Sequence, residues 1–230
     1  MNVTDFDFDS ARYNMIEQQI RPWEVLDSTV LELLSAVRRE DFVPPALRTL
    51  AFTDTELPLR VDGVDTGEVM LAPKVEARFL QALALRAQDQ VLEIGAGSGY
   101  MAALAAHRAA QVFTVEIQAP LVQFAQSNLR RAGLHNVVVA QGDGLNGALP
   151  KDAPTLFDAI IVSGAVARVP RALLEQLKVG GRLVAIVGVA PVMSAQLITR
   201  TSTDAYDTIA LFETLTRPLV DVAFTPPFKF

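Results

Sequence analysis

Three glycines at alternate positions are the clearest sign of chemistry in this chain. Gly95, Gly97 and Gly99 lie in the run Glu93–Tyr100, directly after a short apolar segment and before a helical one. Glycine adopts backbone angles that other residues avoid, and it lets a ligand approach the main chain closely. A helix that begins here offers free N–H groups and the positive end of its dipole. The loop therefore predicts a site for a nucleotide-like ligand.

The spacing of the glycines indicates which ligand. The dinucleotide fingerprint G-x-G-x-x-G/A needs a small residue at its third position, where this chain has the bulky Tyr100. No lysine follows in the arrangement of a phosphate-binding P-loop. Glu93 would repel a pyrophosphate but could hold an amino group, directly or through water. S-adenosylmethionine carries an α-amino group and no phosphate, so the pattern favours it over a dinucleotide or a glycine turn without a ligand.

Polar residues near later strand ends extend this prediction. Glu116 follows the first glycine by about 20 positions, which suits an acceptor for ribose hydroxyls. Asp143 lies between two glycines and is expected to face the adenine amine, while Ser163 is expected to border the reaction pocket. The predicted cofactor-binding residues are Glu93, Gly95, Ala96, Gly97, Ser98, Gly99, Glu116, Ile117, Asp143, Gly144, Leu145 and Ser163.

The elements that position these residues alternate between strands and helices. Strands are expected at Val91–Ile94, Gln111–Val115, Asn136–Ala140, Phe157–Val162 and Arg182–Val187, with helices at Tyr100–His107, Ala119–Arg131 and Pro170–Leu177. Such alternation predicts an α/β, Rossmann-like fold with a mostly parallel sheet and helices on both faces. Two further stretches, Gln196–Arg200 and Thr208–Leu215, have no helix between them and are expected to pair antiparallel at one edge.

Residues 1–86 read as an N-terminal helical extension on the substrate side, and residues 87–230 as the cofactor-binding part of the same structural unit. Asp27 is typical of an N-cap before an apolar helical face. The interval from Pro58 to Pro73 is expected to be a long connection, and Pro73 to begin another helix.

Composition excludes several classes of site and partner. The net charge is −6, so no overall attraction to nucleic acid or anionic lipid is expected. The absence of cysteine excludes disulfides, thiolate nucleophiles and Cys-ligated zinc. The only histidines, His107 and His135, are isolated, and we predict no metal site. The acidic N-terminus does not resemble a signal peptide, and Gly188 and Pro191 interrupt the longest apolar run. We expect a cytoplasmic protein without nucleic-acid or membrane partners.

Taken together, the motifs resemble those of the protein-L-isoaspartate (D-aspartate) O-methyltransferase family. Met15–Arg21 resembles the N-terminal helix of that family, and Val37–Pro44 its V-P-R-x-x-F-V-P segment. The resemblance continues through Val91–Tyr100 and Phe157–Val162 to about Val222. It implies a class I methyltransferase fold and methyl transfer from S-adenosylmethionine to the α-carboxyl group of L-isoaspartyl residues, a protein-repair reaction. The implied acceptor is a peptide or protein carboxylate.

The substrate segment departs from the family pattern G-x-G-Q-T-I-S-Q-P. If its proline is Pro73, the serine position holds Leu71, which cannot donate a hydrogen bond to a carboxylate. Asp62, Asp65 and Glu68 would repel an anionic acceptor if they faced the pocket, although they could equally face solvent. No catalytic residue is assigned. Other interpretations therefore stay open: a methyltransferase with a different, more apolar acceptor, a cofactor-binding protein without isoaspartyl activity, or a dehydrogenase.

Overall fold

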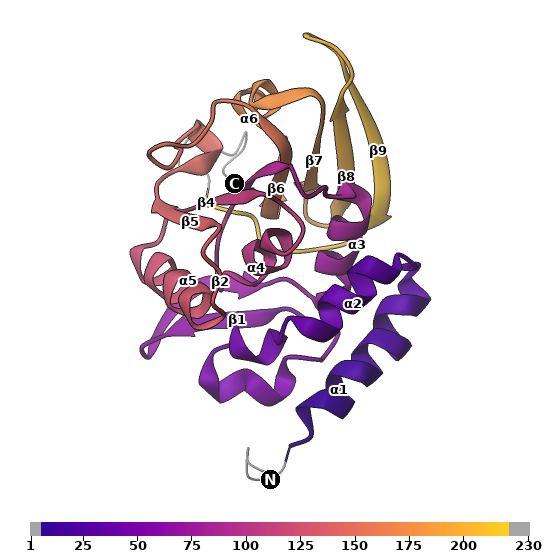
Figure 1. Cartoon of the computed structure of the whole chain (residues 1–230), viewed down its shortest axis with the longest axis vertical. Helices are drawn as coiled ribbons and strands as arrows, with labels where there is room; N and C mark the ends of the chain where they lie inside the picture. The colour runs from indigo at the N-terminus through magenta and orange to yellow at the C-terminus, as the bar shows by residue number, and fades with distance from the viewer. Residues whose placement is uncertain (1–5, 221–230) are drawn as a thin grey trace.

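A computed structural model describes residues 6–220, and a seven-stranded sheet forms its centre (Figure 1). The strand order is β5-β4-β3-β6-β7-β8-β9. The strands are β3 (Gln90–Ile94), β4 (Gln111–Glu116), β5 (Val137–Gln141), β6 (Phe157–Val166), β7 (Leu177–Val189), β8 (Val192–Arg200) and β9 (Tyr206–Glu213). The first five strands in this order pair in parallel, and β8 and β9 add antiparallel at one edge. The predicted sheet is therefore confirmed, including its antiparallel edge.

Alternate residues of the central strands face two different cores. In β3, Val91 belongs to the core that contains α3 (Pro73–Leu83), α4 (Tyr100–Ala106) and α5 (Ala119–Arg131). Its neighbour Leu92 belongs to a second core on the other side, with Leu173 of α6 (Arg171–Glu175). Strands buried on both faces need helices on both sides, as a parallel sheet requires. No helix among residues 6–220 is long and apolar enough to cross a membrane.

Two predicted helix ends have the expected local chemistry. Asp27 caps α2 (Ser28–Ala36), because its carboxylate accepts a hydrogen bond from the Thr29 N–H at 2.8 Å. After α5, Gly133 has a φ of +71°, and the Leu134 N–H donates to the Leu129 carbonyl at 3.1 Å. This pattern is a Schellman-type C-terminal cap, which a glycine at C′ accommodates without strain.

The interval from Pro58 to Pro73 contains regular structure that was not predicted from the sequence. Strands β1 (Leu57–Val61) and β2 (Val64–Met70) form an antiparallel hairpin. Its two-residue turn, Asp62–Gly63, has positive φ at both positions (+50° and +81°). An Asp-Gly pair is a typical hairpin turn, so this signal was present in the sequence. The strands β6 and β7 are also longer than predicted, and α6 is shorter.

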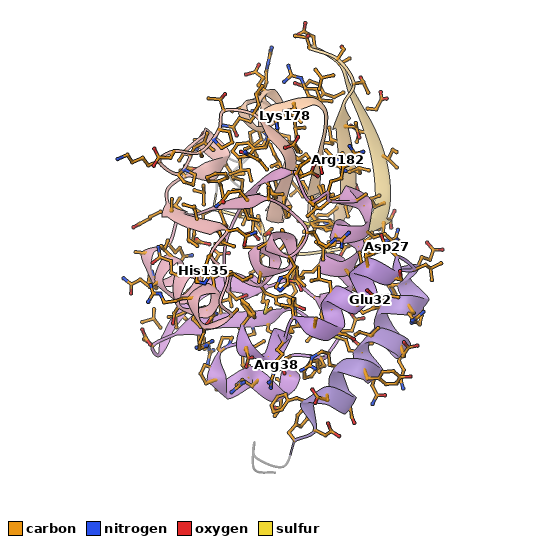
Figure 2. The ribbon with its side chains drawn as sticks, in the orientation of Figure 1. Asp27, Glu32, Arg38, His135, Lys178 and Arg182 are labelled. Carbon is orange, nitrogen blue, oxygen red and sulfur yellow. The ribbon has the colours of Figure 1, made fainter. Side chains whose placement is uncertain are left out.

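Ion pairs occupy the amino-terminal edge of the parallel strands. Asp158, at the start of β6, accepts from the Gln90 N–H at 2.8 Å and from the Lys178 ammonium at 2.8 Å. Arg182 pairs with Asp89 at 2.7 Å. Figure 2 labels Lys178 and Arg182 near this end of the sheet. Ligands of such sheets bind at the carboxyl ends of the strands. The acidic residue Asp158 therefore has a structural role at the opposite edge.

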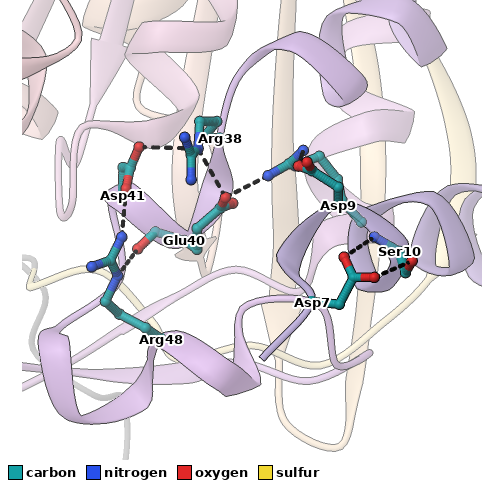
Figure 3. Close-up of polar contacts among 8 residues, drawn as sticks. Asp7, Asp9, Ser10, Arg38, Glu40, Asp41 and Arg48 are labelled. Carbon is teal, nitrogen blue, oxygen red and sulfur yellow. Dashed lines mark hydrogen bonds and ion pairs between the residues drawn. The ribbon is translucent and has the colours of Figure 1, made fainter. Parts of the chain in front are cut away.

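The N-terminal segment wraps around one end of the sheet domain (Figure 1). It consists of α1 (Phe8–Met15), α2, and short helical turns at Ile16–Ile20, Arg21–Trp23, Arg39–Asp41 and Pro45–Leu50. Within it, the buried Glu40 carboxylate binds the guanidinium groups of Arg12 and Arg38 (Figure 3). Arg48 donates to the Asp41 carboxylate at 2.6 Å and to the Glu40 carbonyl at 3.0 Å. These contacts fix α1 against the turn at Arg39–Asp41.

Arg39 connects this segment to the rest of the protein. Its side chain is fully buried and forms an ion pair with Glu76 of α3. It also donates to the carbonyls of Ala51, at 2.9 Å, and Leu71, at 2.6 Å. The guanidinium carbon lies 4.9 Å from the centre of the Tyr100 ring, at the start of α4. The Arg39 side chain therefore fixes the positions of these four contacts relative to one another.

Burial raises the pKa of Glu76 to about 7, although Arg39 acts in the opposite direction. We predict that Glu76→Gln destabilises the protein by about 3–5 kcal/mol above this pKa, where Glu76 is ionised, because it leaves the Arg39 charge buried without its counter-ion. Urea unfolding followed by the fluorescence of Trp23, the single tryptophan, measures this change. The control is Glu175→Gln, which breaks the exposed pair with Arg171 and should have a much smaller effect. Equal effects of the two substitutions would show that the buried Arg39–Glu76 pair contributes no more to stability than an exposed ion pair.

Candidate functional site

A cleft lies at the carboxyl ends of β3, β4 and β6, where the glycine loop joins β3 to α4. Its volume is about 520 Å³ including the open mouth. The hairpin supplies one wall and the segment after β9 supplies another. The lining residues are Leu59, Glu68, Val69, Ile94, Gly95, Gly97, Val115, Glu116, Ile117, Leu121, Gly142, Asp143, Gly144, Leu145, Ser163, Leu219 and Val220. The structure thus brings together most of the residues predicted from the sequence.

The glycine loop lies on the floor of this cleft. Gly95 and Gly97 have φ values of +89° and +50°, which other residues rarely adopt. A Cβ atom on Gly97 would come within 3.2 Å of Leu59, and one on Gly95 within 3.1 Å of Leu219. The loop therefore needs glycine for its backbone shape and for the close approach of the two walls.

Glu116 holds the loop at the end of β4. Its carboxylate accepts from the Gly97 N–H at 3.0 Å and from the Gln118 N–H at 3.0 Å. An ionised carboxylate has about four acceptor positions, so capacity remains for ligand hydroxyls. The geometry suits the predicted ribose contact.

Asp143 lines the cleft, but its carboxylate already caps a helical turn at Gly144–Asn146. It accepts from the Asn146 N–H at 3.2 Å and from the Asn146 side-chain amide at 2.8 Å. The following Gly144 packs so closely that a Cβ atom would lie 2.7 Å from Ile94. This segment therefore forms a shaped wall, and the contact of Asp143 with adenine stays a prediction.

Glu93 lies beneath the loop, whereas the sequence predicted that it would contact the amino group of the ligand. Its carboxyl group is fully buried and accepts from the hydroxyls of Thr114, at 2.7 Å, and Ser163, at 2.8 Å. Burial raises the pKa of Glu93 to about 8, although the two hydroxyls act in the opposite direction. The group is therefore mainly neutral at pH 7, and Ser163 stands between it and the cleft.

A small inner cavity of about 280 Å³ adjoins Glu93 and contains other predicted residues. Ala96, Ser98 and Leu71 line it, together with Ser163. Gly99 lies outside both spaces: a Cβ atom there would meet Leu129 of α5 at 3.2 Å. Because Gly99 has no side chain, α4 and α5 can pack closely together. Gly99 therefore has a packing role here and lines neither the cleft nor the inner cavity.

Glu68 of β2 is a site residue that was not assigned to the cofactor from the sequence. Its half-buried carboxylate lines the cleft and accepts from the Gln118 side-chain amide at 3.0 Å. Burial, and then the nearby Glu116 charge, raise the pKa of Glu68. Asp62 and Asp65 of the same hairpin are exposed instead. Asp62 lies in the hairpin turn, and the register of β2 separates Glu68 in the cleft from Asp65 in solvent.

The residues that line the cleft include the acids Glu68, Glu116 and Asp143, and none of them is lysine, arginine or histidine. Such a lining disfavours a pyrophosphate, which needs positive groups or a cluster of N–H donors. It suits a ligand with hydroxyl groups and a positive charge. S-adenosylmethionine has both, in its ribose and its sulfonium, so the residues present fit this cofactor. Among residues 6–220 there is no cluster of acidic and histidine side chains that could hold a metal ion.

Comparisons with known proteins agree with this chemistry. The family model for protein-L-isoaspartate(D-aspartate) O-methyltransferase matches residues 10–222. A protein-L-isoaspartate O-methyltransferase from Brucella anthropi is 39% identical over 93% of this chain and 94% of its own length. One from Methylorubrum extorquens is 42% identical over 86% of this chain and 82% of its own.

Solved structures share the fold. A protein-L-isoaspartate O-methyltransferase superposes with a TM-score of 0.74 at 25% identity, over 94% of this chain and 66% of that one. A Plasmodium falciparum protein described as a protein-L-isoaspartate O-methyltransferase, solved in complex with S-adenosyl-L-homocysteine, superposes with a TM-score of 0.74 at 19% identity. The superposition covers 94% of this chain and 99% of that one. The class I methyltransferase fold predicted from the sequence is therefore confirmed.

We predict that Glu93→Gln changes how stability depends on pH. The folded protein keeps a proton on Glu93 up to about pH 8, whereas the unfolded chain releases it near the ordinary pKa of 4.5. The free energy of unfolding of the native protein therefore decreases as the pH rises from the unfolded-state pKa to the folded-state pKa. A glutamine side chain does not titrate. Between pH 5 and pH 8, the free energy of unfolding of the variant should therefore rise by more than about 1 kcal/mol relative to that of the native protein.

Urea unfolding of both proteins across this pH range provides the measurement. Glu32→Gln, at an exposed position of α2, is the matched control and should follow the native pH dependence. Parallel pH curves for the native protein and Glu93→Gln would contradict the neutral, buried state of this carboxyl group.

Proposed function

Because this chain belongs to the protein-L-isoaspartate(D-aspartate) O-methyltransferase family, we propose that it methylates the carboxyl group of isoaspartyl residues with S-adenosylmethionine. The observation that carries the proposal is the cation-free, acid-lined cleft at the glycine loop, together with the family match over residues 10–222. We propose a damaged peptide or protein as the acceptor and, as expected from the sequence, a cytoplasmic setting.

The residues that would hold the cofactor follow from the cleft. Gly95 and Gly97 line the cleft, and the free acceptor positions of Glu116 suit the ribose hydroxyls of the cofactor. Gly144 and Leu145 provide a close wall for a flat ring. Ser163 faces both the cleft and Glu93, so its hydroxyl is held in place by a buried partner.

When bound, the cofactor supplies a sulfonium methyl group, which a carboxylate oxygen accepts as the carbon–sulfur bond breaks and its electron pair stays on sulfur. No proton has to be removed, so this chain needs no strong general base. Its residues contribute orientation and the exclusion of water. Leu59, Ile94 and Leu219 form apolar sides of the cleft that serve the second purpose.

Leu71, at the family serine position, favours a second candidate function. Its side chain is buried in the inner cavity, and its carbonyl is bound by Arg39. It offers no hydroxyl to an acceptor carboxylate. A methyltransferase of the same family with a more apolar acceptor is therefore the alternative, and the isoaspartyl reaction requires polar contacts from elsewhere in the chain.

Methyl transfer to a synthetic peptide tests the proposal. We expect label from methyl-labelled S-adenosylmethionine to enter an isoaspartyl peptide as a base-labile ester, and not the same peptide with normal aspartate. Binding of S-adenosylhomocysteine without transfer to the isoaspartyl peptide would overturn the repair role and favour the alternative acceptor. Tighter binding of NAD than of S-adenosylhomocysteine would contradict the cofactor assignment.

Glu116→Gln is predicted to weaken S-adenosylhomocysteine binding by about tenfold. A neutral amide makes weaker hydrogen bonds to hydroxyl groups and to the Gly97 N–H than a carboxylate does. Isothermal titration calorimetry measures the affinity, and Glu213→Gln, on the exposed part of β9, is the control. Native affinity in Glu116→Gln would exclude this carboxylate from cofactor binding.

A further inference from the structure

The glycine loop has a second anchor, which lies outside the cleft. Within the cleft, Glu116 accepts a hydrogen bond from the Gly97 N–H at 3.0 Å. From α5, the side-chain amide of Asn128 donates to the Ser98 carbonyl at 2.9 Å. Asn128 is only 2% exposed and lines neither the cleft nor the inner cavity. The loop is therefore held by a carboxylate at one residue and by a buried amide at the next.

The Ser98 carbonyl depends on this amide for its hydrogen bond. Ser98 is buried and precedes α4, whose first intrahelical bond joins the Ala103 N–H to the Gly99 carbonyl at 2.9 Å. No main-chain N–H among residues 6–220 donates to the Ser98 carbonyl. A buried carbonyl without a partner is unfavourable. Without the amide, the loop would have to shift to bring this carbonyl to another donor or to water.

Arg131, one turn later in α5, fixes the orientation of the Asn128 amide. Its guanidinium donates to Asn128 Oδ1 at 2.8 Å and to the Asp41 carbonyl at 2.6 Å. A side-chain amide has an acceptor end and a donor end, whereas a guanidinium has donors alone. The guanidinium therefore takes the oxygen of the amide, and the NH2 group is directed at the Ser98 carbonyl.

Close packing between α5 and the loop leaves little room for another arrangement (Figure 1). A Cβ atom on Gly99 would lie 3.2 Å from Leu129 and 3.3 Å from Ala125, which are on the same helix as Asn128. The main chain of the loop thus rests directly on α5. A change at Asn128 is therefore passed to the loop.

We propose that Asn128 is a positioning residue for the cofactor and that Arg131 acts through it. The Asn128 amide holds the Ser98 carbonyl, and with it the main chain of the loop, in the shape that binds the cofactor. Arg131 keeps the amide oriented and ties it to the N-terminal segment at Asp41. Neither side chain lines the cleft, so both act on the cofactor indirectly. This inference rests on the proposed binding of S-adenosylmethionine at the loop.

Calorimetry with S-adenosylhomocysteine tests this role without turnover. Asn128→Asp keeps the size of the side chain but replaces its N–H donors with an oxygen that repels the Ser98 carbonyl. We expect this variant to bind S-adenosylhomocysteine at least about tenfold more weakly than the native protein does. In methyl transfer, the KM for S-adenosylmethionine should rise by a similar factor, while kcat and the KM for the peptide stay within about twofold.

Arg131 provides a variant at an exposed position, where a substitution leaves no cavity. Arg131→Met removes the guanidinium donors and should weaken S-adenosylhomocysteine binding by about threefold to tenfold. Arg131→Lys retains a donor and should restore part of the affinity. Arg130→Met is the matched control, because Arg130 is exposed in the same last turn and its loss has the same effect on the helix dipole. The control should keep native affinity.

A double variant separates action through Asn128 from two independent structural effects. If Arg131 acts only through the amide, Arg131→Met should cause no further loss of affinity in an Asn128→Ala background, whereas the effects of independent sites add. Urea unfolding of every variant accompanies the titrations, so that affinities are compared between folded proteins.

Native affinity in Asn128→Asp, additive losses in the double variant, or an equal loss in Arg130→Met would overturn the positioning role, even if the isoaspartyl peptide is methylated. A selective loss in the Asn128 and Arg131 variants supports the role, even if no label reaches that peptide. In that second case the acceptor assignment fails and the positioning role stands, so the two proposals are judged separately.

Discussion

A guanidinium group in a protein interior is stable only when its charge is paired and its N–H groups are hydrogen-bonded. Arg39 meets this requirement with groups from four separate segments: Glu76 of α3, the carbonyls of Ala51 and Leu71, and the ring of Tyr100. No smaller part of the fold satisfies it. The N-terminal segment, the end of the hairpin and the helix after the glycine loop are therefore fixed relative to one another by one buried charge.

The contacts of Arg39 with Tyr100 and Leu71 matter for function. Tyr100 begins the helix whose first turn follows the glycine loop, and Leu71 directly follows the hairpin, whose strands form a wall of the cleft. A displacement of Arg39 would move the loop and the wall together. The N-terminal segment from α1 to the turn at Pro45–Leu50 thus contributes to the site without lining the cleft, because it holds the guanidinium in place through the turn at Arg39–Asp41.

Two glutamates on neighbouring strands show how position along a strand decides chemistry. Glu116 ends β4, where it accepts two backbone N–H bonds and reaches the cleft. Glu93 precedes the end of β3 by one residue, so its side chain turns into the interior, where burial keeps it protonated near neutral pH. The first is available to ligand hydroxyls. The second supports Ser163 and the underside of the loop.

The sequence by itself determined the alternating strands and helices, the glycine loop, the cofactor class and the family. These depend on local patterns: apolar periodicity, capping residues and the spacing of Gly95, Gly97 and Glu116. It did not determine which acids face the cleft, because the register of β2 decides between Glu68 and Asp65. The inward position of Glu93 and the pairing of Arg217 and Leu219 with Ala165 were also beyond it. Those features join residues far apart in the chain, so only tertiary packing brings them together.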